Sequence, residues 1–134
     1  MTSLSTSCLG QRADFFGCQQ DPAAATGTRI SLHNNPLVTL EEPRRNISVT
    51  ATQVVPSGQV LGSEERLTVD QAIRAQTIDA AWPLFSDDVI APLEIGKYAD
   101  MVVLSADPRT VPPERIADLE VCAMFLAGLR VYPQ

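Results

Sequence analysis

The chain has 134 residues, of which 45% are hydrophobic and 19% charged, and its formal net charge is −6. This composition is typical of one globular domain and excludes a disordered protein. The sequence pI is about 4.6, and the only adjacent basic residues are Arg44 and Arg45. Because binding to a phosphate backbone requires clustered lysine and arginine, we expect no nucleic-acid partner.

The lack of a recognisable targeting signal predicts a cytoplasmic protein. No stretch approaches the length of about 18 apolar residues that a membrane span needs, and no basic segment precedes the first apolar residues. The three cysteines are Cys8, Cys18 and Cys122. An odd number without a CxxC pair argues against both a disulfide framework and a zinc knuckle. Cys8 and Cys18 could pair, but we expect them to be reduced. Cys122 lies in an apolar run, so we expect a buried thiol there.

The N-terminal third of the sequence predicts little regular structure. Residues 1–27 are rich in Ser, Thr, Gln and Gly, and their apolar residues follow neither a helical nor a strand period. Residues 29–33 alternate between polar and apolar side chains and are followed by Asn34-Asn35-Pro36, which predicts a short strand that runs into a loop. Pro43 fits the first position of a helix that we expect to extend to Val55.

The clearest helical signal begins at Thr68. Thr68 and Gln71 have the spacing of a capping box, in which each side chain binds the backbone N–H of the other residue. Apolar residues then recur at helical spacing, so we expect a helix of about four turns that ends near Trp82, because Pro83 disfavours the helical conformation before it. Trp82 and Phe85 should form the hydrophobic end of this helix.

The C-terminal part predicts strands. Residues 99–104 contain the continuous apolar run MVVL, which is typical of a strand covered on both faces. A single helical turn is expected at 112–116. Two further strands, 121–126 and 129–132, flank Ala127-Gly128, where glycine supplies the positive φ of a tight hairpin turn.

Several of these segments carry motifs that occur together in a known family. They are ISLHNNPLV at 30–38, SGQVLG at 57–62, LTVDQAIRAQTIDAAWPLF at 67–85, LEIGKYADMVVLSADPRTV at 93–111 and VCAMFLAGLRVY at 121–132. In this order they resemble the C-terminal end of the metal-dependent amidohydrolases of family 3, the YtcJ-like group. The resemblance covers most of the chain.

The resemblance implies an α/β fold in two parts. Residues 28–90 would match the last strand and helices of a (β/α)8 barrel. Residues 91–134 would match the C-terminal strands of a small β-sandwich, which in such enzymes is built from both ends of the chain. As an isolated piece, the chain would be an α+β protein.

The resemblance also implies a site at the end of the first predicted strand. In the family, an aspartate there binds the catalytic metal and takes the proton of the attacking water, and Asn35 stands at its position in this sequence. A neutral amide cannot accept that proton near neutral pH. His33 and Asn34 are candidates for a substrate pocket.

Complete members of the family hold zinc or another divalent metal, whereas this chain has one histidine. A zinc centre uses three protein ligands and an open position, so we expect no complete metal site and no cofactor in this chain. Other polar residues have structural interpretations: we expect a turn at Asp100, a solvated loop at Asp87-Asp88, and no Schiff-base chemistry at Lys97.

These observations predict a C-terminal fragment of an amidohydrolase, a hydrolase of non-peptide carbon–nitrogen bonds, that is inactive alone. Its partner would be a complementing N-terminal barrel part, or a second copy bound through exposed strands. The alternative is a non-enzymatic α+β interaction module, or a subunit that completes a separately encoded barrel.

Overall fold

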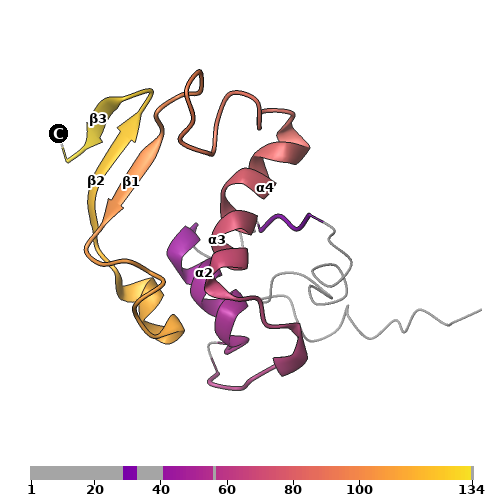
Figure 1. The fold of residues 1–134 in the computed structure, drawn as a ribbon. Coiled ribbons are helices and arrows are strands. Elements are labelled where there is room, and N and C mark those ends of the chain that lie inside the picture. The colour runs from indigo at the N-terminus through magenta and orange to yellow at the C-terminus, as the bar shows by residue number, and fades with distance from the viewer. Residues whose placement is uncertain (1–28, 33–40, 56, 134) are drawn as a thin grey trace, which may run out of the picture.

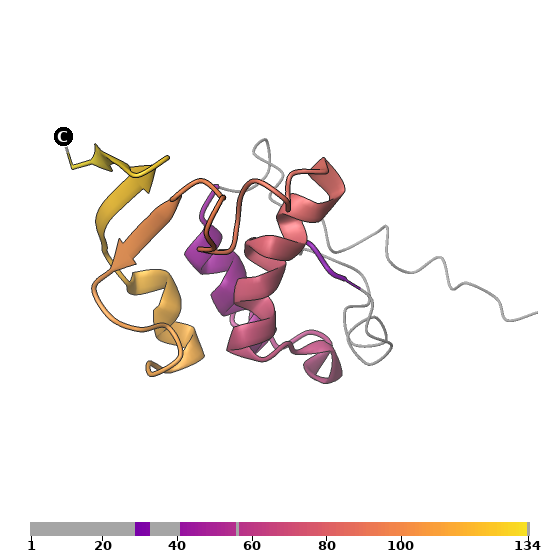
Figure 2. The same ribbon diagram turned by 45° about the horizontal axis from the view of Figure 1, so that its top comes forward.

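The computed structural model describes residues 29–32, 41–55 and 57–133, so the predicted loose segment 1–27 lies outside the described residues. Figures 1 and 2 show a helical part and a small sheet that stands beside it. The main elements, in chain order, are α2 (Pro43–Thr52), α3 (Val69–Gln76), α4 (Ile78–Ala81), β1 (Met101–Leu104), β2 (Val121–Leu126) and β3 (Leu129–Tyr132). Three 3-10 helices accompany them, namely η2 (Ser63–Glu65), η3 (Trp82–Leu84) and η4 (Pro113–Asp118). The described chain is therefore a small α+β piece.

Helix α2 lies between α3 and η4, with which it makes its main contacts. Pro43 occupies its first turn as predicted. The helix ends earlier than expected, because Gln53 adopts a left-handed conformation with φ of 58° and its N–H bonds to the carbonyl of Val49. Polar side chains on α2 are buried, and Asn46 Nδ2 donates to Gln76 Oε1 of α3 at 3.2 Å. Such pairing removes most of the cost of burying polar groups.

The capping box at the start of α3 is confirmed. The N–H of Gln71 donates to Thr68 Oγ1 at 3.2 Å, and Gln71 Oε1 accepts from the N–H of Thr68 at 2.8 Å. The single long helix predicted to follow is wrong, because Thr77, with φ of −121° and ψ of −98°, separates α3 from α4. The Thr77 hydroxyl donates to the carbonyl of Ile73 at 2.7 Å, a local bond that competes with the helical pattern.

The hydrophobic end predicted for this helix is not formed. Trp82 is 52% exposed and Phe85 is 94% exposed. Trp82 is the first residue of η3, and Phe85 follows its last residue in a left-handed conformation. Neither side chain therefore contributes to the core of the described residues.

The sheet is antiparallel in the order β1-β2-β3, and the predicted hairpin is confirmed. Ala127 and Gly128 have φ of 49° and 80°, the positive values that the central residues of a type I′ turn require. Asp100 Oδ1 accepts from the N–H of Ala127 at 2.7 Å, so its predicted structural role is also confirmed. The single turn expected at 112–116 is the longer 3-10 helix η4.

The strand predicted at 29–33 is wrong for residues 29–32, which form no strand. The N–H of Leu32 instead donates to the carbonyl of Ala75 in α3 at 3.1 Å. A strand requires a neighbouring strand for its backbone hydrogen bonds. The three described strands all pair with one another in the C-terminal sheet, and none is available to this segment.

The described core is small and the described apolar surface is large. Eight hydrophobic residues are buried, half of them alanines: Leu32, Leu67, Ala72, Ala75, Ala81, Ile116, Leu119 and Ala123. Sixteen large hydrophobic residues are exposed, twice as many as are buried. Where exposed apolar side chains form a contiguous patch, they commonly mark a binding surface.

Much of this apolar surface belongs to the sheet. Val102, Met124 and Tyr132 are cross-strand partners on one face, and they are 53%, 43% and 50% exposed. The prediction that β1 is covered on both faces is therefore wrong for the described residues, and so is the prediction of a buried thiol at Cys122, which is exposed. The apolar pattern is that of a buried strand, but the described residues supply no layer to cover it.

Candidate functional site

The predicted site residues His33, Asn34 and Asn35 lie outside the described residues. The last described residue before them is Leu32. The structure therefore defines the approach to the predicted site: the segment Arg29–Leu32 and the side chains that hold it.

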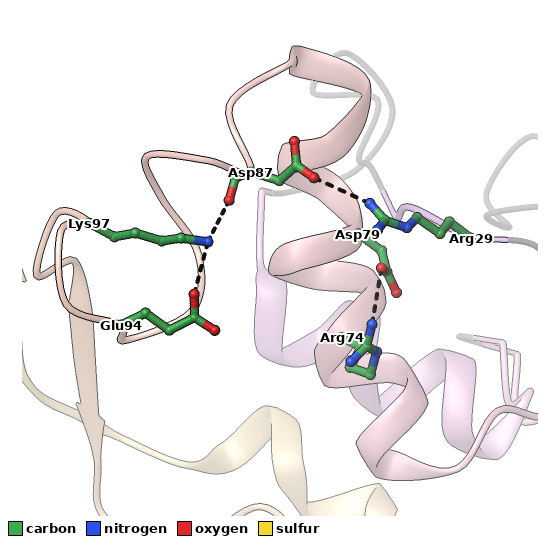
Figure 3. Close-up of polar contacts among 6 residues, drawn as sticks. All are labelled: Arg29, Arg74, Asp79, Asp87, Glu94 and Lys97. Atoms are coloured by element: carbon green, nitrogen blue, oxygen red, sulfur yellow. Dashed lines mark hydrogen bonds and ion pairs between the residues drawn. The ribbon is translucent and has the colours of Figure 1, made fainter.

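This segment is held at both of its ends. At one end Leu32 is buried, and its N–H bonds to the carbonyl of Ala75 in α3. At the other end Arg29 Nη1 lies 3.3 Å from Asp87 Oδ2, and its guanidinium carbon lies 5.5 Å from the centre of the Trp82 ring. This is within the range of a cation–π contact. Figure 3 shows Arg29 reaching Asp87, which follows η3.

Asp87 is bound a second time, through its backbone. Lys97 Nζ donates to the carbonyl oxygen of Asp87 at 2.6 Å and lies 3.2 Å from Glu94 Oε2 (Figure 3). The Lys97 side chain is only 16% exposed. Its amine is thus engaged in two polar contacts, in line with the structural role expected from the sequence. Asp87 departs from the expected solvated loop, because its carboxylate and its carbonyl both have partners, whereas Asp88 is exposed.

Two further ion pairs join separate elements of the described chain. Arg74 Nη2 lies 3.5 Å from the buried Asp79 and spans the break between α3 and α4 (Figure 3). Arg109 Nε donates to Asp70 Oδ1 at 2.6 Å and so links the loop after β1 to the first turn of α3. The hydrogen bond and the charge of Asp70 raise the pKa of Arg109 above its ordinary value. Both contacts connect elements and leave no reactive group poised for chemistry.

The described side chains do not form a zinc centre by themselves. Across residues 29–32, 41–55 and 57–133, no three His, Cys, Asp or Glu side chains are grouped closely enough to hold a metal ion. The whole chain contains one histidine, whereas a catalytic zinc uses three protein ligands. The sequence resemblance predicts one ligand position in this chain, at Asn35, which lies outside the described residues.

The contacts of Arg29, Asp87 and Lys97 were not predicted from the sequence. Arg29 and Asp87 are separated by 58 residues, and no spacing rule pairs positions so far apart. The available signal was the charge of Arg29 next to the apolar Ile30, in a segment whose alternating pattern predicted a strand. In the described helices, no stretch has the length and apolar character needed to cross a membrane.

A family model described as "Amidohydrolase family" matches residues 22–132. This match covers most of the chain and includes every described element. The chain belongs to the amidohydrolase family. The resemblance inferred from the sequence motifs is thereby confirmed.

Individual proteins agree with this assignment. An N-substituted formamide deformylase from Arthrobacter pascens is 26% identical over 106 residues, which are 79% of this chain and 20% of that protein. The crystal structure of an amidohydrolase from Thermotoga maritima MSB8 superposes with a TM-score of 0.57 and 22% identity, over 83% of this chain and 24% of that one. The second likeness is one of fold. The chain spans about a fifth of the first protein and about a quarter of the second.

Proposed function

We propose that this chain is the C-terminal portion of a hydrolase of non-peptide carbon–nitrogen bonds and that it has no such activity alone. The observation that carries the proposal is the family match over residues 22–132, in a chain that spans only a fifth of a relative's length. In this proposal residues 28–90 are the end of a (β/α)8 barrel, in which residues 29–32 would form a strand only beside a strand that the described residues do not supply, and residues 91–134 contribute to a β-sandwich. The metal, zinc or another divalent ion, is held mostly by residues that precede this portion.

The exposed sheet supports a partner for this portion. Sixteen large hydrophobic side chains are exposed among the described residues, and β1 has a neighbour on one edge only. We propose that this surface binds a complementing N-terminal barrel part. The competing occupant is a second copy of the chain, and a non-enzymatic interaction module is the competing function.

The direct test is reconstitution. The chain is assayed for hydrolysis of an N-substituted formamide and for bound zinc. Both assays are made on the chain alone and after coexpression with the N-terminal portion of an amidohydrolase. That portion ends at the residue where the match to this chain begins. We expect no turnover from the chain alone and a stable complex after coexpression. Stoichiometric zinc with turnover by the isolated chain would overturn the proposal. A dimer of the chain that excludes the N-terminal portion would favour self-association.

Asn35 provides a sharper test within the complex. A proton-accepting side chain contributes roughly 10²–10⁴-fold to a rate, so N35D should raise hydrolysis by the complex at least about 10²-fold. The matched control is N34D, which adds the same charge one position earlier. If N34D gives an equal gain, Asn35 does not occupy the position of the family aspartate.

A further inference from the structure

The open edge of β1 faces the helical part of the described chain. In Figures 1 and 2, β2 lies on one side of β1, and helices α2 and α3 stand across from the other side. A groove of about 500 Å³ lies between this edge and α3. Its walls include Ile73 of α3 and three consecutive residues of β1, Val102, Val103 and Leu104. Since consecutive residues of a strand point to opposite faces of a sheet, a groove lined by all three follows the edge of β1.

One end of the groove is closed by polar contacts of the loop after β1. Arg109 Nε donates to Asp70 Oδ1 at 2.6 Å, so this loop meets the first turn of α3. Asp107 Oδ1 accepts from the N–H of Arg109 at 2.9 Å. The other side chains that line the groove are all apolar: Ile73, Val102, Val103, Leu104, Ala106 and Pro108. A molecule that fills the groove should therefore offer apolar side chains.

The backbone of β1 also contributes to the groove, as the residues that flank the strand indicate. The carbonyl of Ala99 accepts from the N–H of Gly128 at 2.9 Å, and the N–H of Ser105 donates to the carbonyl of Glu120 at 2.9 Å. Both bonds lie on the β2 side of the strand. Because backbone groups in an antiparallel strand point to the two edges in turn, the odd-numbered positions of this segment bond toward β2.

The register shift in the sheet does not interrupt this alternation. It falls between Val103 and Leu104, whose partners are residues 123 and 121, so the extra residue is Cys122 on β2. The alternation along β1 is therefore continuous. Val102 and Leu104 direct their N–H and C=O groups to the open edge and into the groove.

An extended segment fits these features. Free backbone groups at a strand edge, next to a pocket for apolar side chains, are the elements by which proteins bind an added strand. A second copy of this sheet would bring β1 with β2 paired behind it, and α3 stands where that β2 would have to lie. The groove therefore favours a single strand. This chain spans about a fifth to a quarter of its two relatives, so most of a complete enzyme lies outside it and can supply the strand.

We propose that one extended strand of the complementing N-terminal portion adds to the edge of β1. It pairs with the backbone of Val102 and Leu104 and places an apolar side chain against Ile73. This inference rests on the proposed function. It assigns the contact with that partner to the edge of β1, with a register fixed by two backbone positions, and distinguishes it from packing on a face of the sheet.

Hydrogen exchange of single amides, followed by NMR, tests the proposal without a substitution. In the chain alone, the amides of Val102 and Leu104 should exchange rapidly, whereas that of Val103, which points toward β2, should be protected. In the coexpressed complex, new hydrogen bonds should slow the exchange of Val102 and Leu104 by at least about tenfold. The exchange of Val103 should change less.

Two substitutions at one position separate the backbone of Val102 from its side chain. Proline is tolerated in an edge strand where the N–H faces away from the sheet, so V102P should keep the far-UV circular dichroism of wild type. It removes one donor and should weaken the complex by about tenfold. V102A removes more apolar surface than V102P but keeps the donor, so it should bind more tightly than V102P.

Relative affinity is measured by competition. Wild-type and variant chains with different tags are coexpressed with a limiting amount of the N-terminal portion, and the ratio of the captured chains is determined. If V102A is captured no better than V102P, pairing through the backbone is overturned.

The failure of this proposal is distinguishable from the failure of the proposed function. A complex in which Val102 and Leu104 exchange as fast as in the chain alone would overturn strand addition only. A dimer of the chain alone that protects both amides would make a second copy the occupant and would also overturn it. Absence of any complex with the N-terminal portion would overturn the proposed function and, with it, the added strand.

Discussion

Ile116 offers the most direct test of how the described residues hold together. It lies in η4, is 0% exposed and is one of the two largest side chains that are fully buried. It also belongs to the element that packs most extensively on α2. The substitution I116A should therefore lower the free energy of unfolding substantially.

The magnitude follows from the atoms that are removed. Replacing Ile by Ala deletes three carbon groups, and each contributes about 0.8 kcal/mol when buried. The cavity left behind adds about 1 kcal/mol where neighbours relax only in part. The expected loss is about 3.5 kcal/mol. A small domain has a total stability of roughly 5 kcal/mol, so most of it should be lost.

The assay is urea unfolding followed by far-UV circular dichroism and by Trp82 fluorescence. The chain contains a matched control, since Ile95 is 108% exposed and I95A makes the same chemical change in solvent. I95A should change the free energy of unfolding by less than about 0.5 kcal/mol. If I116A costs no more than I95A, the packing of η4 on α2 does not hold the described residues together.

Three other predictions test local features. T68A removes the capping-box acceptor and should cost about 1 kcal/mol in urea unfolding, whereas T68S should cost little. Gly128 has φ of 80°, and no atom lies closer than 3.9 Å to an added Cβ. G128V should therefore lower the free energy of unfolding by about 1–2 kcal/mol through backbone strain alone, and G128N should lower it less. A melting temperature of G128V equal to that of wild type would contradict this. In a C8S/C18S background, Cys122 should react completely with a thiol reagent in the native protein, because it is exposed; a thiol that reacts only in urea would show that another surface covers it.

Features that depend on neighbours in the sequence were predictable. The capping box of Thr68 and Gln71 uses two residues that are three positions apart, and the hairpin turn uses two adjacent residues with positive φ. The capping-box bonds close within three residues, and the positive φ of the turn is a property of the local backbone. The helix break at Thr77 is also local, but it arises from a side-chain bond to Ile73 that competes with the helix, and periodicity does not reveal such a bond.

Features that depend on distant surfaces could not be predicted in the same way. The apolar pattern of β1 indicates that its side chains require burial. It does not indicate whether the described residues supply the surface that would cover them. For the same reason the expected burial of Cys122 was wrong. The pairing of Arg29 with Asp87 depends on how the segment before Leu32 meets the loop after η3, which no spacing in the sequence encodes. The placement of Asn35 at the family's metal position stays a prediction.

The open edge of β1 has a consequence for the solubility of this protein. Its outward backbone groups face no other strand of the sheet, and the residues of β1 carry neither a charge nor a proline that would discourage pairing. Pairing through such an edge depends on encounters between molecules, so it grows more than proportionally with concentration. When the chain is made in excess over the partner that covers this edge, the excess should therefore precipitate. Synthesis of the chain and its partner in equal amounts, rather than a larger free energy of unfolding, would then keep the chain in solution.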